Sequence, residues 1–174
     1  MLRTFSNVQL DFEALPSTHE ISYFPLERKY FFVLLVNAFV FFVSILILLI
    51  YLWTVIEKDW FVNNFQWMLV GLLIIFLLQF AYMFKAFTFK GYAFRQKDIS
   101  YKTGWLWRSI TTVPFNRVQH CEVSQGVMDR YFGLAKLKIF TAGGSSSDVV
   151  VPGLRLDQAT DLKDFILEKI KEDE

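Results

Sequence analysis

Two apolar stretches decide the fold: YFFVLLVNAFVFFVSILILLIYLWTVI at residues 30–56 and WFVNNFQWMLVGLLIIFLLQFAYMF at residues 60–84. Neither stretch contains Asp, Glu, Lys or Arg, and together they hold much of the 54% hydrophobic content of the chain. A helix needs about 20 apolar residues to cross about 30 Å of hydrocarbon. A core helix of a soluble protein would carry charges on its outer face. The pattern therefore predicts a two-helix transmembrane hairpin over residues 30–84.

The segment that precedes the first stretch argues against a cleaved signal peptide. The apolar region of a signal peptide has about 7–15 residues and lies close to the N-terminus. Here residues 1–29 come first and are mostly polar, with several acidic side chains. We interpret the first stretch as an uncleaved anchor, residues 1–29 as an N-terminal cytoplasmic segment and residues 85–174 as a cytoplasmic domain.

Basic residues flank the hairpin on both sides, before the first stretch (Arg28, Lys29) and after the second (Lys85, Lys90, Arg95). The turn between the stretches reads Glu-Lys-Asp and is net negative. Loops rich in Lys and Arg stay on the cytoplasmic side of a membrane. We therefore expect a multi-pass protein of the plasma or inner membrane with both termini in the cytoplasm.

Polar residues within the stretches suggest how the helices pack. Asn37 and Gln79 lie at similar depths from the flanking charges, so we predict an amide–amide hydrogen bond between the helices. Such a bond contributes about 0.6–2 kcal/mol in a membrane. The stretches have no ionisable group other than tyrosine, which argues against transport or channel activity.

After residue 84 the pattern changes to short alternating runs separated by turn residues. We predict strands at residues 105–113, 118–125, 135–141 and 149–151, with a turn at 102–104 and a hairpin loop at 142–147. From Asp157 to about residue 172 the apolar positions have helical spacing, which indicates an amphipathic helix. Strands followed by one terminal helix indicate a small antiparallel sheet or barrel with the helix over its open end.

An ordered set of motifs runs through this domain. Val113-Pro114-Phe115-Asn116-Arg117-Val118-Gln119 precedes Gln125-Gly126, and Arg130-Tyr131-Phe132-Gly133-Leu134-Ala135, Thr141-Ala142-Gly143 and Pro152-Gly153-Leu154 follow. The set resembles the bacterial pleckstrin-homology-like (PH-like) domain family, once catalogued as a domain of unknown function, and in particular its YdbS-like membrane proteins. The resemblance covers residues 30–174.

The resemblance implies an α+β membrane protein, in which a transmembrane hairpin is followed by a strongly bent seven-stranded antiparallel sheet capped by a C-terminal helix. It also implies a membrane-tethered binding or scaffold module, often considered together with a larger sister that carries several copies of the domain. The partners that it suggests are other membrane proteins of the same family or a second copy of the chain. The fold alone does not imply phosphoinositide binding, because function depends on the site.

Charge is distributed unevenly along the domain. Residues 85–138 contain ten Lys and Arg against three acids, whereas residues 148–174 contain eight acids against four bases. A cation held close to an anionic leaflet gains about 1 kcal/mol. The candidate contacts to lipid headgroups, chosen for their proximity to the hairpin, are Lys85, Lys90, Arg95 and Lys97. The alternative interpretation is that these cations only obey the positive-inside bias.

Four polar residues within the motif set form a candidate anion or partner site: Arg117, Gln119, Gln125 and Arg130. The alternative is structural, with these side chains satisfying turn carbonyls near Pro114 and Gly133.

Enzymatic and metal chemistry find little support in the sequence. One cysteine and two histidines exclude a disulfide framework and a cysteine-based zinc site, and adjacent strand residues such as His120 and Cys121 point to opposite faces. The Gly/Ser-rich loop at 141–147 lacks the Gly-Lys-Ser/Thr ending of a phosphate loop. We expect no catalytic residue, metal or cofactor. The bilayer is a simpler target than nucleic acid for the basic surface, so we expect no nucleic-acid partner.

The sequence therefore predicts a membrane-anchored, non-catalytic binding or scaffold module. The alternative is a module that binds the headgroups of anionic lipids.

Overall fold

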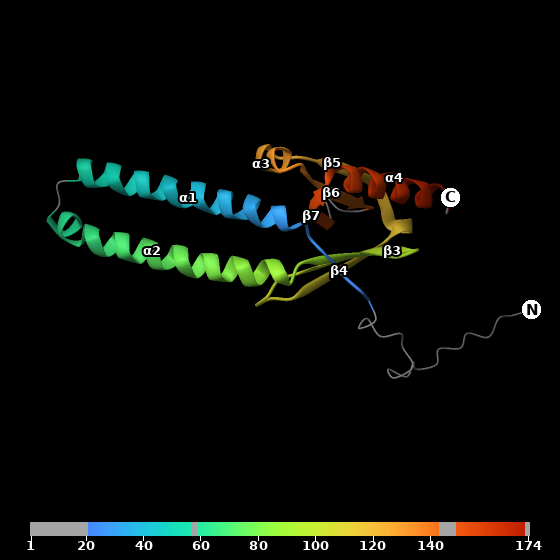
Figure 1. Cartoon of the computed structure of the whole chain (residues 1–174), viewed down its shortest axis with the longest axis horizontal. Helices are drawn as coiled ribbons and strands as arrows, with labels where there is room; N and C mark the ends of the chain where they lie inside the picture. Colours follow the sequence, from blue (N-terminus) through green and yellow to red (C-terminus); the bar gives the residue numbers. More distant parts are fainter. Residues whose placement is uncertain (1–20, 57–58, 143–148, 173–174) are drawn as a thin grey trace, which may run out of the picture.

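The computed structural model describes residues 21–56, 59–142 and 149–172. Two long helices, α1 (Arg28–Val55) and α2 (Asp59–Thr88), lie antiparallel and extend away from a β-rich domain (Figure 1). Both helices consist mainly of apolar residues and contain no proline. α2 also has an acid, Asp59, in its first turn and a base, Lys85, in its last, and both charges interact favourably with the helix dipole. The expected helix pair is confirmed.

The domain contains two antiparallel sheets. The first has the order β1-β2-β3-β4 and comprises β1 (Phe24–Pro25), β2 (Gly91–Phe94), β3 (Asp98–Thr103) and β4 (Ser109–Pro114). The second has the order β5-β6-β7 and comprises β5 (Val118–Ser124), β6 (Leu134–Thr141) and β7 (Val149–Arg155). A 3₁₀ turn, η3 (Phe115–Arg117), connects the sheets, and a short helix, α3 (Val127–Tyr131), lies between β5 and β6.

The C-terminal helix α4 (Leu156–Glu172) covers the second sheet. It contacts β5, β6 and β7, and its Ala159 and Ile166 are fully buried. The ring of Phe165 meets the ring of Phe115 edge-on at 6.0 Å, which joins the helix to the connection between the sheets. Antiparallel sheets capped by a C-terminal helix are the predicted fold class.

The start of α1 belongs to the core of this domain. Tyr30 and Val33 are buried in one cluster with residues of both sheets, and Leu26 joins them. β1 pairs with β2, with Phe24 opposite Tyr92. The packing unit therefore includes residues 24–33, which the sequence divides between the N-terminal segment and the hairpin.

Three local expectations differ from the structure. The strand predicted from Trp105 begins at Ser109 instead, because the chain turns at Gly104, which has a φ of 88° and where a Cβ atom would collide with the Trp107 carbonyl. The predicted hydrogen bond between Asn37 and Gln79 is absent from the described residues. Gln79 lines a groove between the helices, whereas Asn37 does not. The strand predicted at 149–151 continues through Pro152 and Gly153 to Arg155. The predicted loop at 142–147 lies outside the described residues from Gly143 onward and stays a prediction.

Cys121 on β5 offers a solution test of the packing between the second sheet and α4. Burial raises the pKa of its thiol to about 11, against an ordinary value of 9.0, although Lys163 of α4 acts in the opposite direction. We expect alkylation by iodoacetamide at pH 8 to be about a hundredfold slower in the folded chain than in denaturant, because the thiolate is the reactive form. Stability from the neutral thiol is present below pH 9 and decreases from about pH 9 to 11. Equal rates in the folded and denatured chains would contradict the packing.

Candidate functional site

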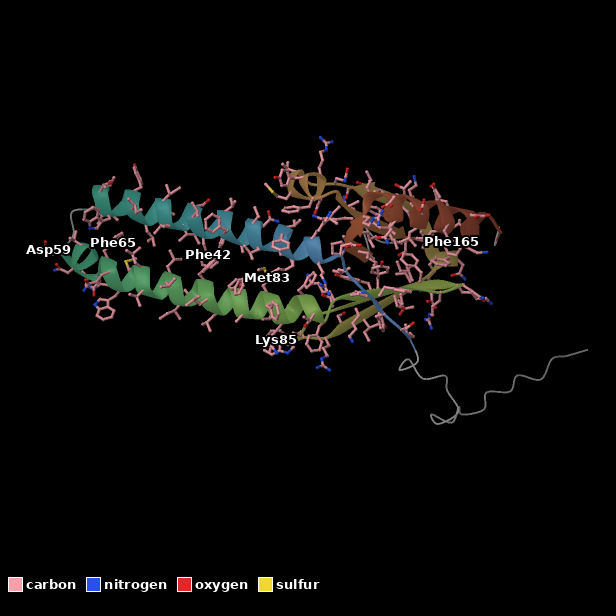
Figure 2. The ribbon with its side chains drawn as sticks, in the orientation of Figure 1. Phe42, Asp59, Phe65, Met83, Lys85 and Phe165 are labelled. Carbon is pink, nitrogen blue, oxygen red and sulfur yellow. The ribbon has the colours of Figure 1, made fainter. Side chains whose placement is uncertain are left out.

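A groove of about 600 Å³ lies where the two helices meet the first sheet. Apolar side chains of α1 and α2 form its walls, among them Phe42 and Met83, which Figure 2 shows between the helices. Lys90, Thr103 and Gly104 close the groove at its domain end. The groove therefore has apolar walls along its length and one cation, Lys90, at its domain end, which we call the head of the groove.

Lys90 is half-buried at this head, in the two-residue connection between α2 and β2. Its Nζ atom lies 5.7 Å from the centre of the Tyr30 ring. Within the part of the chain that the structure describes, Lys90 forms no ion pair with an acidic side chain. Burial lowers the pKa of Lys90, because the ammonium loses solvation without gaining a counter-charge.

The structure separates the four cations predicted to contact lipid headgroups. Lys85 is exposed at the domain end of α2 (Figure 2), and Lys90 lies at the head of the groove. Arg95 and Lys97 lie in the β2–β3 turn at the opposite end of β2, a distance of about 13 Å at the usual rise per strand residue. The Arg95 guanidinium also forms an ion pair with Asp98 at 2.7 Å. Of the four candidates, only Lys85 and Lys90 lie near the helix ends.

The predicted partner-site residues are also apart. Arg117, the last residue of η3, and Gln119, near the start of β5, are exposed, whereas Gln125 and Arg130 follow the end of β5. Gln125 donates from Nε2 to the Leu134 carbonyl at 2.6 Å, next to Gly133. That bond fits the structural interpretation of Gln125. Arg130 is exposed on α3.

A family model described as Bacterial PH domain matches residues 30–170, which is most of the chain. The chain belongs to the bacterial PH domain family. This confirms the resemblance carried by the motif set, and the matched region includes both long helices.

Among solved structures, the PH domain chain is similar to a DUF1696 family protein with a pleckstrin-homology domain from Shewanella loihica PV-4, solved at 2.00 Å resolution. The sequence identity is 17%, the TM-score is 0.35, and the match covers 47% of this chain and 71% of that chain. No curated protein matches this chain.

The bacterial PH domain family supports a binding or scaffold module in general. Members of the family are in general non-catalytic binding modules. Over residues 21–56, 59–142 and 149–172, no group of three or more His, Cys, Asp or Glu side chains has a metal-binding arrangement. The groove instead offers apolar surface and one ammonium group.

Sequence reasoning found Lys90 from its position but missed the residues that build its surroundings in the PH domain. Gly104, about 14 residues after Lys90, lines the groove, and the ring of Tyr30, about 60 residues before Lys90, lies beside the Lys90 ammonium. Periodicity reports which face of a helix is apolar, but it does not report which distant turn closes the end of a groove. No sequence signal would have assigned Tyr30 to this site.

Proposed function

We propose that this bacterial PH domain protein is a membrane-anchored, non-catalytic binding or scaffold module at the cytoplasmic face of the membrane. One observation carries the proposal: only 6% of the most apolar 18-residue window of each long helix is buried. A core helix of a soluble protein would be mostly buried. Exposed apolar helices are stable when lipid is their solvent, since their backbone hydrogen bonds are internal.

The charge pattern supports the cytoplasmic placement of the domain. Lys85 lies in the last turn of α2 and Lys90 follows the helix, and Arg28 and Lys29 begin α1, so the domain ends of both helices are basic. Basic flanks remain on the cytoplasmic side during insertion. The same ends are fixed to the domain, by the Tyr30 packing on one side and by the short connection to β2 on the other. A module held in this way would present a defined surface to partners.

The partners that we propose are a second copy of this chain or other membrane proteins of the same family. A photo-crosslinking residue at Ile74, whose side chain is exposed on α2, would test this in native membranes. We expect a discrete adduct from position 74 and none from a matched crosslinker at Gln96 in the β2–β3 turn. If the chain carried no crosslinked partner with the photo-crosslinking residue at either position, the scaffold proposal would be contradicted.

A second candidate function is the binding of one anionic phospholipid in the groove. It is favoured by Lys90, which is half-buried and forms no ion pair with any acidic side chain among the described residues. The groove extends from Gly104 along α2 to Ile75, which is about 20 Å of helix and more than the half-thickness of about 15 Å of a bilayer core. A lipid could therefore place its phosphate beside Lys90 and an acyl chain along the apolar walls.

We expect Lys90→Glu to lower retention of phosphatidylglycerol by about tenfold, because it replaces attraction by repulsion at the head of the groove. Native mass spectrometry of the full chain released from mixed phosphatidylglycerol and phosphatidylcholine micelles would measure the retained lipid. Lys97→Glu makes the same charge change at the far end of β2 and should have little effect. Equal losses in the two variants would exclude a site at Lys90.

A further inference from the structure

Two exposed apolar tips protrude from the PH domain. The β3–β4 tip, residues 104–108, carries Trp105, Leu106 and Trp107, and the Trp107 side chain is 84% exposed. The α3 tip, residues 127–131, carries Val127 and Tyr131, each 83% exposed. The tips come from different sheets and are separated in the sequence, so they are two independent features.

The β3–β4 tip lies beside the last turns of α2. The rings of Trp105 and Tyr82 are 6.3 Å apart. Trp105 also lines a shallow hollow together with Leu78 and Lys85 of α2. The tip therefore reaches the level of Tyr82, two residues before the apolar stretch ends at Phe84.

The α3 tip lies beside the first turns of α1 (Figure 1). Phe132, directly after α3, stacks on Phe32 of α1 with a centroid distance of 6.5 Å and an interplanar angle of 18°. Phe32 is two residues into the first apolar stretch. The two tips thus occupy the same level at the helix ends, one beside each helix.

Buried contacts fix the α3 tip in this position. Asp129 is 1% exposed, and its carboxylate accepts a hydrogen bond from the Gly126 N–H at 3.0 Å. The same carboxylate forms an ion pair with Lys136 of β6 at 3.1 Å. A charged side chain held in this way anchors the start of α3 to the second sheet, while Val127 and Tyr131 remain exposed.

The composition of the tips is that of a membrane interface. Trp and Tyr are enriched where a bilayer meets water, because their rings are apolar and their N–H or O–H groups find polar partners there. Each tip also carries one exposed arginine, Arg108 or Arg130, whose long stem allows the charge to reach headgroups. Large exposed apolar groups at one level would be costly if water surrounded both tips.

We propose that the β3–β4 tip and the α3 tip insert into the headgroup region of the cytoplasmic leaflet, on either side of the helix pair. This inference rests on the proposed anchoring of α1 and α2 and commits to the phospholipid bilayer as the occupant. The PH domain would then contact the membrane at three places, which fixes its orientation. The domain end of the groove, which Gly104 helps to close, would lie at the level of the headgroups.

Depth-dependent fluorescence quenching of the full chain in vesicles of phosphatidylcholine and phosphatidylglycerol tests the inference. A Cys121→Ala background would carry one new cysteine with a fluorophore, in the variants Leu106→Cys and Val127→Cys. Ile47→Cys on the exposed surface of α1 is the control inside the proposed span, and Lys97→Cys is the control at the far end of β2. Spin-labelled lipids with shallow and deep labels are the quenchers.

We expect both tip labels to be quenched several-fold more than the Lys97 label, and most strongly by the shallow spin label. Tip labels as weakly quenched as Lys97, with Ile47 strongly quenched, would overturn the inference and leave the anchoring intact. Tip labels that crosslink between copies without quenching would assign the tips to a protein interface and also overturn it. An unquenched Ile47 label would remove the proposed anchoring, and the inference with it.

Discussion

Replacing Gly153 with alanine is expected to separate the start of α1 from the PH domain and to lower the free energy of unfolding by about 3 kcal/mol. Gly153 has a φ of 66°, a conformation that residues with a side chain rarely adopt. A Cβ atom there would lie 2.7 Å from Cβ and Cγ of Tyr30. The Gly153 carbonyl also accepts a hydrogen bond from the Glu27 N–H at 3.1 Å. One methyl group would therefore disturb both the backbone and the buried Tyr30 contact.

Denaturant unfolding in mild detergent, followed by hydrogen exchange in β6 and β7, would measure this loss. Gly71→Ala is the matched control, because a Cβ at Gly71 in α2 meets nothing within 4 Å. Alanine also favours a helix over glycine by about 1 kcal/mol. Similar stabilities of the two variants would mean that the start of α1 does not pack on β7.

Two arginines at the centre of the helix pair should have the largest effect of all. In the double variant Ile47→Arg with Ile74→Arg, each arginine costs about 3 kcal/mol near the middle of a bilayer, or about 6 kcal/mol together. Ile47 is 62% exposed and Ile74 is also exposed, so in water the same change would remove apolar surface and aid solubility. The sign of the effect therefore distinguishes lipid from water around the helices.

The measurement is the fraction of the chain that stays in the membrane pellet after alkaline extraction. The double variant Gln96→Arg with Asn116→Arg adds the same charge on the exposed surface of the domain and should remain in the pellet. If the Ile47/Ile74 variant also remained fully in the pellet, or became a stable soluble protein, the helices would not have lipid as their surroundings.

Much of the fold could be predicted from local patterns, because the elements concerned have clear periodicity. The long helices follow from uninterrupted apolar residues, β6 from the alternation of Leu137 and Ile139 with lysines, and α4 from helical spacing. The predicted strand began four residues too early, at Trp105, because tryptophan favours strands wherever it occurs, whereas residues 109–113 do lie in β4. The strand tendency of single residues takes no account of the turn at Gly104, where a Cβ atom would collide with the Trp107 carbonyl.

Long-range packing could not be predicted in the same way. The burial of Tyr30 depends on Gly153, more than a hundred residues later, and no spacing rule connects them. Asn37 and Gln79 were matched by depth alone, but depth does not determine which side of a helix faces its neighbour. Arg95 and Lys97 were grouped with Lys90 from their nearness in sequence, although β2 carries them away from the helix ends.

Cysteine accessibility in intact cells tests the central claim most directly, which is that α1 and α2 cross the membrane and hold the PH domain in the cytoplasm. In a Cys121→Ala background, Asp59→Cys places a thiol at the start of α2 and Lys97→Cys places one in the β2–β3 turn. With a membrane-impermeant maleimide, we expect labelling at position 59 in intact cells and at position 97 only after lysis. Labelling at position 97 in intact cells, or none at position 59 before lysis, would contradict the account.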